Sequence, residues 1–402
     1  MKHNKKLAVI HTHPIQYLAP LYRQIQQQGI PVTAVYGSDF SIVGYKDEEF
    51  DTSFAWDKDL VSGYTSKFLE RSQGGGARSV EEASVRRLWQ VLTNVEPTSI
   101  MLSAYYPWFH SLACVISIVY ASTYDVNLLF RAETTDHAQE RGLFHKYSRD
   151  VILSVLYSYC DHFFYIGKRS KKHYEKFNIE EENMSFSPYS VDRSSFMLEE
   201  KHRQNIVKKA LKEMKLKKSS FKILFVGKLS YRKGVDMLVD AVGNMEISKR
   251  KNTTVIFVGQ GDAESSLKRK AAKKDVDAHF VGFQKQSDLS KFYHAANVLV
   301  LPSRWGETWG LVVNEALHHG IPSIVSNQVG CAPDLINEGF TGEVFESGSV
   351  ESLKRAVAKV YNKYCFDSER RKKIKKYVEK YSIKKSAKSV VEVIKKSQIK
   401  KE

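Results

Sequence analysis

Two glutamates lie on either side of a glycine that separates a loop from a predicted helix. They are Glu307 and Glu315, in the stretch LPSRWGETWGLVVNEALHHGIPSIVS that begins at Leu301. A carboxylate in the loop and another in the helix can each accept hydrogen bonds from ligand hydroxyl groups. A solvated surface is the plain alternative for either glutamate alone. The loop, the helix and the spacing of each glutamate from the glycine together favour a ligand site.

The start of the same helix is a candidate anion site. The first N–H groups of a helix point outward at the positive end of its dipole and can hold a diphosphate. Glycine at position 310 also lets a ligand approach the backbone closely. The expected donors are the N–H groups of Gly310, Leu311 and Val312.

A second candidate site is the basic turn in FVGKLSYRKGVDMLVDAV, which begins at Phe225. The predicted strand ends at Gly227, and the turn that follows carries Lys228, Arg232 and Lys233. Cations at the end of a strand can neutralise a pyrophosphate and stabilise it as a leaving group. Surface charge is the plain alternative, but the position after the first strand of the second half favours a ligand site.

The elements that must position these residues alternate between short β-branched runs and helical patterns, which indicates parallel βα units. In the second half, strands are predicted at Phe221–Val226, Thr253–Val258, from His279, Val298–Leu301 and Ser323–Ser326. The intervening helices are predicted at Val235–Met245, Asp262–Lys273, Ser287–Ala295 and Leu311–His319. The first half has predicted strands at Leu7–His11, Val32–Tyr36, Ser99–Ser103, Asn127–Phe130 and His162–Ile166.

The fold class is therefore α/β, with two doubly wound domains and a cleft that faces the carboxyl ends of both sets of strands. We expect an N-terminal domain at 1–198, a basic helical linker at 199–220 and a C-terminal domain at 221–365. Basic helices at 366–402 are expected to pack back on the N-terminal domain.

Composition supports a globular protein, because 42% of the 402 residues are hydrophobic and 27% are charged. The nearest two of the four cysteines, Cys331 and Cys365, are too far apart for zinc or redox motifs. The longest apolar stretches are about half of the roughly 20 residues that span a bilayer. These features predict a cytoplasmic protein, with peripheral association at the inner face of the membrane as a further expectation.

The net charge is +17, from 62 basic and 45 acidic residues. Such a charge attracts polyanions, including anionic lipid and nucleotide-linked substrates, although a solvated helical face is equally compatible. In the basic C-terminal segment, Ile374, Val378 and Ile383 form an apolar stripe that would pack on the first domain. The lysines opposite the stripe would then face anionic lipid.

The second half resembles the retaining glycosyltransferases of family 4, which have the GT-B fold of two facing Rossmann-like domains. The resemblance covers about Phe221–Val360 and rests on GKLSYRKG, VGQGD, VGF, the block with both glutamates, and VGCAPDLI.

The resemblance implies that Lys228 and Lys233 bind the donor diphosphate, that Glu315 binds the ribose and that Glu307 contacts the transferred sugar. Of these, Glu307, Lys233 and Lys228 are the expected catalytic residues. The other expected donor-binding residues are Gly227, Arg232, Phe283 beside the nucleoside, Thr308, Trp309, Gly310, Leu311 and Val312. The family usually has arginine where Lys228 stands, and lysine lacks its bidentate fork.

The first half resembles the family more loosely, through HPIQYLAPLYRQI from His13, an opening similar to bacterial surface-polysaccharide glycosyltransferases. Residues expected on the acceptor side are His13, Gln16, Arg131 and Glu133. For the last two, a structural salt bridge is the alternative. An aromatic cluster around Tyr105, Tyr106, Trp108, Phe109 and His110 fits either a hydrophobic core or a sugar-stacking platform.

No metal or other cofactor is expected. His11 and His13 share one face of a strand but have no evident third ligand. The Asp-x-Asp tripeptides at Asp57 and Asp275 follow no buried strand and are interpreted as solvated charge. Lysines and a helix terminus would supply the positive field that a metal otherwise provides.

The resemblance implies transfer of a hexose-type sugar from a nucleotide diphosphate, a UDP-sugar above all, to a saccharide or lipid-linked saccharide acceptor, with retention of configuration. A nucleotide-sugar epimerase on the same fold is the first alternative. A basic module that binds anionic surfaces or nucleic acid is the second. The tail tyrosines Tyr377 and Tyr381 are spaced like one packed helical face, so no nucleic-acid partner is expected.

Overall fold

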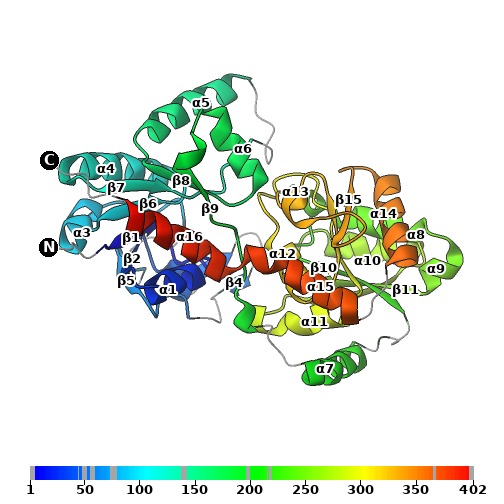
Figure 1. Cartoon of the computed structure of the whole chain (residues 1–402). Helices are drawn as coiled ribbons and strands as arrows, with labels where there is room; N and C mark the ends of the chain where they lie inside the picture. Colours follow the sequence, from blue (N-terminus) through cyan, green and yellow to red (C-terminus); the bar gives the residue numbers. More distant parts are fainter. Residues whose placement is uncertain are drawn as a thin grey trace. The chain divides into compact units, whose positions relative to one another are not determined.

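The computed structural model describes residues 5–43, 45–47, 52–54, 59–72, 79–136, 143–195, 200–214, 216, 220–364 and 368–397. The chain forms two compact units. Unit 1 combines residues 1–136, 140–190 and 381–402, and unit 2 contains 137–139 and 191–380. Figure 1 shows the elements of both units.

Unit 1 is built on a seven-stranded parallel sheet in the order β5-β2-β1-β6-β7-β8-β9. Its strands are β1 (Leu7–His11), β2 (Val32–Tyr36), β5 (Thr65–Phe68), β6 (Ser99–Leu102), β7 (Asn127–Phe130), β8 (His162–Tyr165) and β9 (Met184–Phe186). A separate hairpin joins β3 (Tyr45–Asp47) and β4 (Thr52–Phe54). The central strands β1, β6 and β7 are buried along their whole length, as expected for a parallel sheet covered on both faces.

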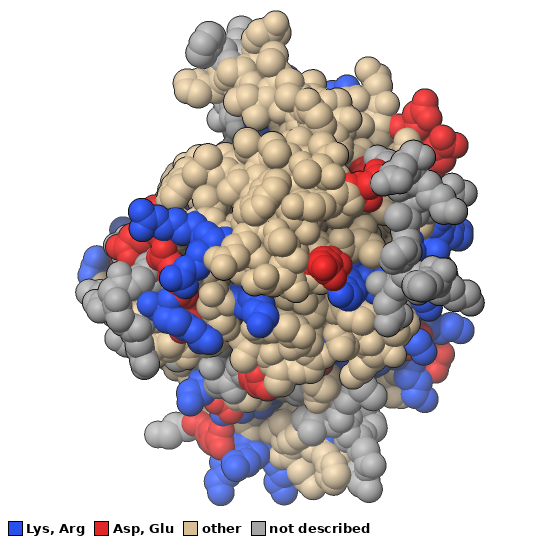
Figure 2. Space-filling model, turned by 90° about the vertical axis from the view of Figure 1, so that its left-hand side faces the viewer, with Lys and Arg blue, Asp and Glu red and all other residues tan. Residues whose placement is uncertain are grey.

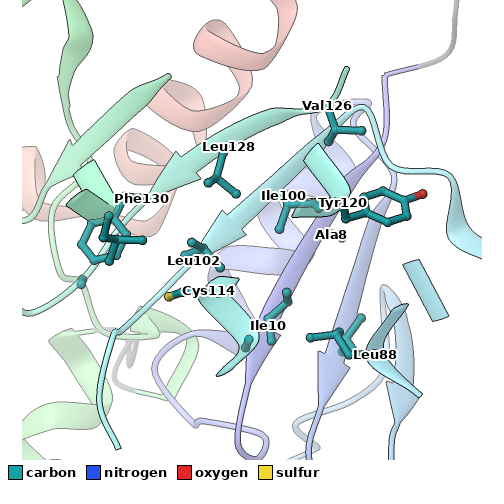
Figure 3. Packing of buried hydrophobic residues seen from close by; sticks show 14 of the residues in the cluster. Ala8, Ile10, Leu88, Ile100, Leu102, Cys114, Tyr120, Val126, Leu128 and Phe130 are labelled. Carbon is teal, nitrogen blue, oxygen red and sulfur yellow. The ribbon is translucent and has the colours of Figure 1, made fainter. Parts of the chain in front are cut away.

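Except for α16, which comes from the C-terminal part of the chain, the helices of unit 1 follow its strands in βα order. They are α1 (Ala19–Gln27), α2 (Phe40–Val43), α3 (Leu88–Val95), α4 (Trp108–Tyr124), α5 (Leu143–Ser158), α6 (Lys168–Lys176) and α16 (Ile383–Lys396). Figure 3 shows the core between the sheet and two of them, where Leu88 of α3 and Cys114 and Tyr120 of α4 meet side chains of β1, β6 and β7. The inner faces of these helices therefore belong to the core.

Unit 2 has a six-stranded parallel sheet in the order β12-β11-β10-β13-β14-β15. The strands are β10 (Phe221–Val226), β11 (Thr253–Val258), β12 (Asp277–Gly282), β13 (Val298–Leu301), β14 (Ser323–Ser326) and β15 (Gly342–Phe345). Numbered from the first strand, this order is 3-2-1-4-5-6, that of the dinucleotide-binding doubly wound fold. The expected α/β class with two Rossmann-like domains is confirmed.

The helices of unit 2 are α7 (Glu200–Glu213), α8 (Val235–Gly243), α9 (Ile247–Lys251), α10 (Glu264–Lys273), α11 (Ser290–Ala295), α12 (Leu311–His318), α13 (Ala332–Leu335), α14 (Val350–Lys363) and α15 (Ser368–Val378). A short 3-10 turn, Tyr231–Lys233, precedes α8. Leu238, Val242, Leu317, Val357 and other apolar side chains bury one face of these helices.

The domain division differs from the expected one at the linker and at the C-terminal segment. The stretch expected as a linker contains α7, which packs against α11 within unit 2 because Ala210 and Leu211 are buried. The basic C-terminal helices divide between the units. In α15, Ile374 and Val378 are buried in unit 2, whereas α16 packs against α1 in unit 1.

Among the helices of the described residues, none is both long enough and apolar enough to cross a bilayer.

Candidate functional site

The two loops singled out from the sequence follow β10 and β13, the adjacent strands at which the order of the unit 2 sheet reverses. In doubly wound sheets, ligands bind outside the carboxyl ends of the strands at this switch point. Lys228 and Lys233 follow β10, while Glu307 follows β13. The fold therefore brings the basic turn and the glutamate loop to the place where a ligand is expected.

Lys233 and Glu307 form an ion pair at the centre of this site. The Lys233 ammonium donates to a Glu307 carboxylate oxygen at 2.5 Å, and the Ser303 hydroxyl donates to the same oxygen at 3.0 Å. Only 16% and 14% of the two charged side chains are exposed. The pair is thus held in a partly water-excluded place, where its field on a ligand is stronger than at the surface.

Lys228 differs from Lys233 in its surroundings. Its side chain is half-buried, and the ion pairs and side-chain hydrogen bonds found among the described residues do not include its ammonium group. Its positive charge is therefore available to an anionic ligand without first breaking an ion pair.

Arg304 connects the loop after β13 to the segment after β10. Its guanidinium makes a bidentate pair with Asp236 at 2.7 and 2.8 Å, and it lies 3.8 Å from the centre of the Tyr231 ring. It also donates to the backbone carbonyl of Tyr231 at 2.6 Å. Planar bidentate pairs of this kind are geometrically specific, so they hold the turn before Lys233 in one conformation. Sequence reasoning missed this clamp because Arg304 and Asp236 are 68 positions apart.

Arg232, expected to bind the donor, contacts the loop that carries Glu307. Its guanidinium donates to the Gly306 carbonyl at 3.2 Å, and its own carbonyl accepts from the Arg304 N–H at 2.8 Å. In this structure the side chain therefore supports the loop backbone.

Gly330 packs directly under the glutamate loop. Its N–H donates to the Glu307 carbonyl at 2.9 Å, and a β-carbon at position 330 would lie 1.8 Å from the Thr308 carbonyl oxygen. No real contact is that short, so any larger residue must displace the loop. Glycine is required here by close approach of two backbones.

We expect Gly330→Ala to lower the free energy of unfolding by about 1–3 kcal/mol, as overpacking does, and to weaken nucleoside diphosphate binding because the loop must shift. Gly339→Ala is the control, since a β-carbon there meets nothing within 4 Å although its positive φ carries its own strain. Urea unfolding and calorimetric titration measure both effects. Equal binding losses in the two variants would contradict the assignment of this loop to the ligand site.

Glu315 is buried, and both of its carboxylate oxygens accept hydrogen bonds. Gln286 donates to one at 2.7 Å, and the Tyr293 hydroxyl donates to the other at 2.5 Å. Burial, followed by the charge of Glu315, raises the pKa of Tyr293 well above its ordinary value, so Tyr293 remains a donor at neutral pH. A carboxylate has about four lone-pair positions, so each of its oxygens can accept more than one hydrogen bond.

The start of α12 has the predicted form. Gly310 is its N-terminal cap with a φ of 95°, and Leu311 and Val312 are half-buried in the first turn. Phe283 and Thr308 are also half-buried, in the loops after β12 and β13. Trp309 is buried and its indole N–H donates to Asn314 at 2.8 Å, which gives this side chain a supporting role in the loop. Gly227 follows β10 with a φ of 146°.

The acceptor-side candidates lie in unit 1. Burial, followed by the charge of His110, lowers the pKa of His13 to about 4, so this imidazole is neutral at pH 7. Burial also lowers the pKa of His110 to about 4. The Gln16 side-chain oxygen is buried and has no hydrogen-bond partner within the described part of the chain. These neutral polar groups suit hydroxyl recognition better than anion binding.

Arg131 and Glu133 have separate hydrogen-bond partners. Arg131 is buried and donates to the Ser187 hydroxyl at 3.0 Å and to the Ser187 carbonyl at 3.1 Å. Glu133 accepts from the hydroxyls of Tyr17, at 2.9 Å, and Tyr189. The contacts of Arg131 with Ser187 and of Glu133 with Tyr189 join the segments that follow β7 and β9, and they differ from the Arg131–Glu133 salt bridge considered as the alternative.

The aromatic cluster of unit 1 divides between core and surface. Phe109 and His110 are buried, whereas Tyr106 and Trp108 are exposed. His11 is buried between the Tyr22 and Ser103 hydroxyls rather than open to a metal.

In the second Asp-x-Asp tripeptide, Asp275 pairs with Arg250. Asp57 lies outside the described residues. Within the described ranges, no group of three or more His, Cys, Asp or Glu side chains is arranged to hold a metal ion.

Residues 207–381 match the family model of the group 1 glycosyl transferases. Most of unit 2 therefore lies in a segment that matches this family model. An uncharacterized glycosyltransferase of Methanocaldococcus jannaschii is 34% identical over 176 residues, which are 43% of this chain and 44% of the relative. Spore coat protein SA of Bacillus subtilis is 31% identical over 163 residues, 39% of this chain and 42% of that protein. The chain thus spans less than half the length of these curated relatives.

Solved structures match nearly the whole chain. Sucrose-phosphate synthase from Thermosynechococcus elongatus has a TM-score of 0.72 at 15% identity and covers 97% of this chain and 98% of its own. HepE from Anabaena, solved in complex with UDP, also has a TM-score of 0.72 at 14% identity. The match covers 98% of this chain and 100% of HepE. At such identities the likeness establishes the fold alone, which is that of two Rossmann-like domains as in GT-B proteins.

Proposed function

We propose that the chain is a retaining glycosyltransferase that moves a hexose-type sugar from a nucleotide diphosphate, with UDP as the first candidate, to an acceptor hydroxyl. The observation that carries this proposal is the Lys233–Glu307 pair, held beside the start of α12 at the switch point of a doubly wound sheet. It places a cation, a carboxylate and a helix N-terminus together in one unit.

The roles follow from the chemistry of each group. Lys228, Lys233 and the first turn of α12 would stabilise the negative charge that develops on the leaving diphosphate. Glu307 would orient the transferred sugar, and Glu315 would accept hydrogen bonds from the ribose. The departing diphosphate would take the acceptor proton on the same face, so the proposal needs neither a dedicated base nor a divalent metal.

Relatives support a place in surface polysaccharide or glycolipid synthesis. Two structural neighbours are a lipopolysaccharide outer core galactosyltransferase, WaaB, and WaaG, a glycosyltransferase involved in lipopolysaccharide biosynthesis. His13 and Gln16 are the proposed contacts of a saccharide or lipid-linked saccharide acceptor, because their buried polar atoms are suited to hydroxyl groups.

Thermal unfolding with a panel of nucleoside diphosphates and nucleotide sugars tests the donor proposal. Binding to the folded state alone stabilises it by about 2.7 kcal/mol at a ligand concentration 100 times the dissociation constant. We expect one nucleoside diphosphate and its sugar conjugates to raise Tm, with EDTA present. No shift with any of them would contradict the proposal. Release of an epimerised sugar from donor alone would favour the epimerase instead.

A further inference from the structure

Helix α4 has an apolar outer face as well as an apolar inner one. None of its seventeen residues is Asp, Glu, Lys or Arg. Its inner side chains pack on the sheet, whereas Trp108, Leu112, Val115, Val119 and Tyr124 are 43–57% exposed. The first four are spaced by four, three and four positions, so they follow one line along the helix.

Helix α5 continues this face. Tyr147, Val151, Ile152, Val155 and Tyr159, the last just beyond the helix, are 48–73% exposed. Its inner residues belong to the same buried core as those of α4. The two helices follow the adjacent strands β6 and β7 and lie together on one side of unit 1 in Figure 1. In Figure 2, which faces that side of the molecule, a broad area is tan, and charged side chains lie along its borders.

A continuous exposed apolar area on a folded unit marks an interaction surface. Its composition distinguishes the kinds of partner. Protein interfaces concentrate Trp, Tyr and Arg at their centre, where Leu and Val are under-represented. Here Leu112, Val115, Val119, Val151 and Val155 form the middle of the two helices, and Trp and Tyr lie near the helix ends. Aromatic residues around an aliphatic centre are typical of surfaces that insert at the level of lipid headgroups.

Helix α6 provides a basic border beside α5. The two helices contact each other through Tyr157 and His173, 3.1 Å apart, and through the Asp150–Lys176 pair at 2.7 Å. The nine residues of α6, KRSKKHYEK, include five Lys or Arg and one Glu. Lys172 on α6 and Lys146 on α5 are exposed. Such cations are attracted to anionic headgroups.

We propose that the α4–α5 face, with the basic border of α6, docks unit 1 on an anionic lipid bilayer. The aliphatic side chains insert between headgroups, the aromatic ones lie at headgroup level, and the lysines contact lipid phosphates. This surface is formed by α4, α5 and α6 and therefore differs from the C-terminal lysines considered from the sequence. The proposal stands independently of the glycosyl transfer reaction.

Co-sedimentation of the full chain with phosphatidylcholine vesicles, with or without phosphatidylglycerol, tests this surface. We expect binding to the anionic vesicles, weakening with salt, and at least about tenfold weaker binding to phosphatidylcholine alone. Ile152→Glu should reduce anionic binding at least about tenfold because it places a carboxylate in the apolar centre. Ile247→Glu, on α9 in unit 2, is the matched control, since the two isoleucines are 60% and 63% exposed.

A second pair of variants, one target and one matched control, tests the basic border. Lys172→Glu should weaken anionic binding and its salt dependence, whereas Lys273→Glu, at a lysine that is also exposed on α10 of unit 2, should leave both unchanged. Absence of wild-type binding to anionic vesicles at low salt would overturn the proposal, as would equal losses in target and control variants. A wild-type dimer in sedimentation velocity that Ile152→Glu converts to a monomer would assign the face to a second copy instead.

Discussion

Lys233→Ala is expected to reduce kcat for sugar transfer by about 10²-fold or more, the usual cost of removing one preorganised electrostatic donor to a developing negative charge. The lysine lies 2.5 Å from Glu307 in a partly buried site, so water cannot fully replace its charge. Steady-state kinetics with a nucleotide sugar and a saccharide acceptor measure the loss.

Two further variants separate charge from folding. Lys233→Arg keeps the charge and should retain more activity than the alanine variant. Lys273→Ala removes an exposed lysine of α10 and should leave kcat unchanged. Thermal unfolding of Lys233→Ala shows whether the unpaired Glu307 carboxylate destabilises unit 2. A folded Lys233→Ala protein with kcat near the wild-type value would remove this lysine from the mechanism.

The two glutamates are expected to respond differently to substitution, because only Glu307 is proposed to contact the transferred sugar. Glu315→Ala should weaken both nucleoside diphosphate and intact donor. Glu307→Gln should leave nucleoside diphosphate affinity nearly unchanged, lower kcat and change discrimination between sugars that differ at one hydroxyl. A buried polar group left unpaired costs about 1–3 kcal/mol, which corresponds to roughly 5- to 150-fold in affinity or rate.

Calorimetric titration of both variants with nucleoside diphosphate and with donor provides the measurement. Glu315→Ala also leaves Gln286 and Tyr293 without their acceptor, so Tyr293→Phe is the control for loss of support. It keeps the carboxylate and should lose less affinity than Glu315→Ala. Equal losses for both ligands in both glutamate variants would mean that the carboxylates only support the loops.

The interior of both sheets could be predicted from the sequence because buried parallel strands are short, continuous apolar runs. The predicted bounds of β1, β2, β7, β10, β11, β13 and β14 agree with the structure residue for residue. The edge strands β5, β9 and β15 were missed. The residues of β5, TSKF, alternate between exposed and half-buried positions, so a polar edge strand resembles a loop in the sequence.

Loop positions in the candidate site could be predicted from glycine and charge, but their partners could not. The sequence places Lys233 and Glu307 after two separate strands, and only the strand order shows that β10 and β13 are neighbours. The Arg304–Asp236 clamp and the Gln286 and Tyr293 contacts of Glu315 join positions 22 to 68 residues apart. Nothing in the local pattern of either partner indicates these pairings.

Unit 1 is discontinuous along the chain, which affects the order in which it can fold during synthesis. Residues up to 190 form its sheet, but α16 joins it only after all of unit 2 has been made. Lys5, at the start of the unit, donates to the Ser397 carbonyl at 2.5 Å across 392 positions. Until α16 emerges from the ribosome, the apolar side chains of α1 that it covers stay exposed. Unit 2 can therefore complete its core before unit 1, the reverse of the usual order in which the N-terminal domain folds first.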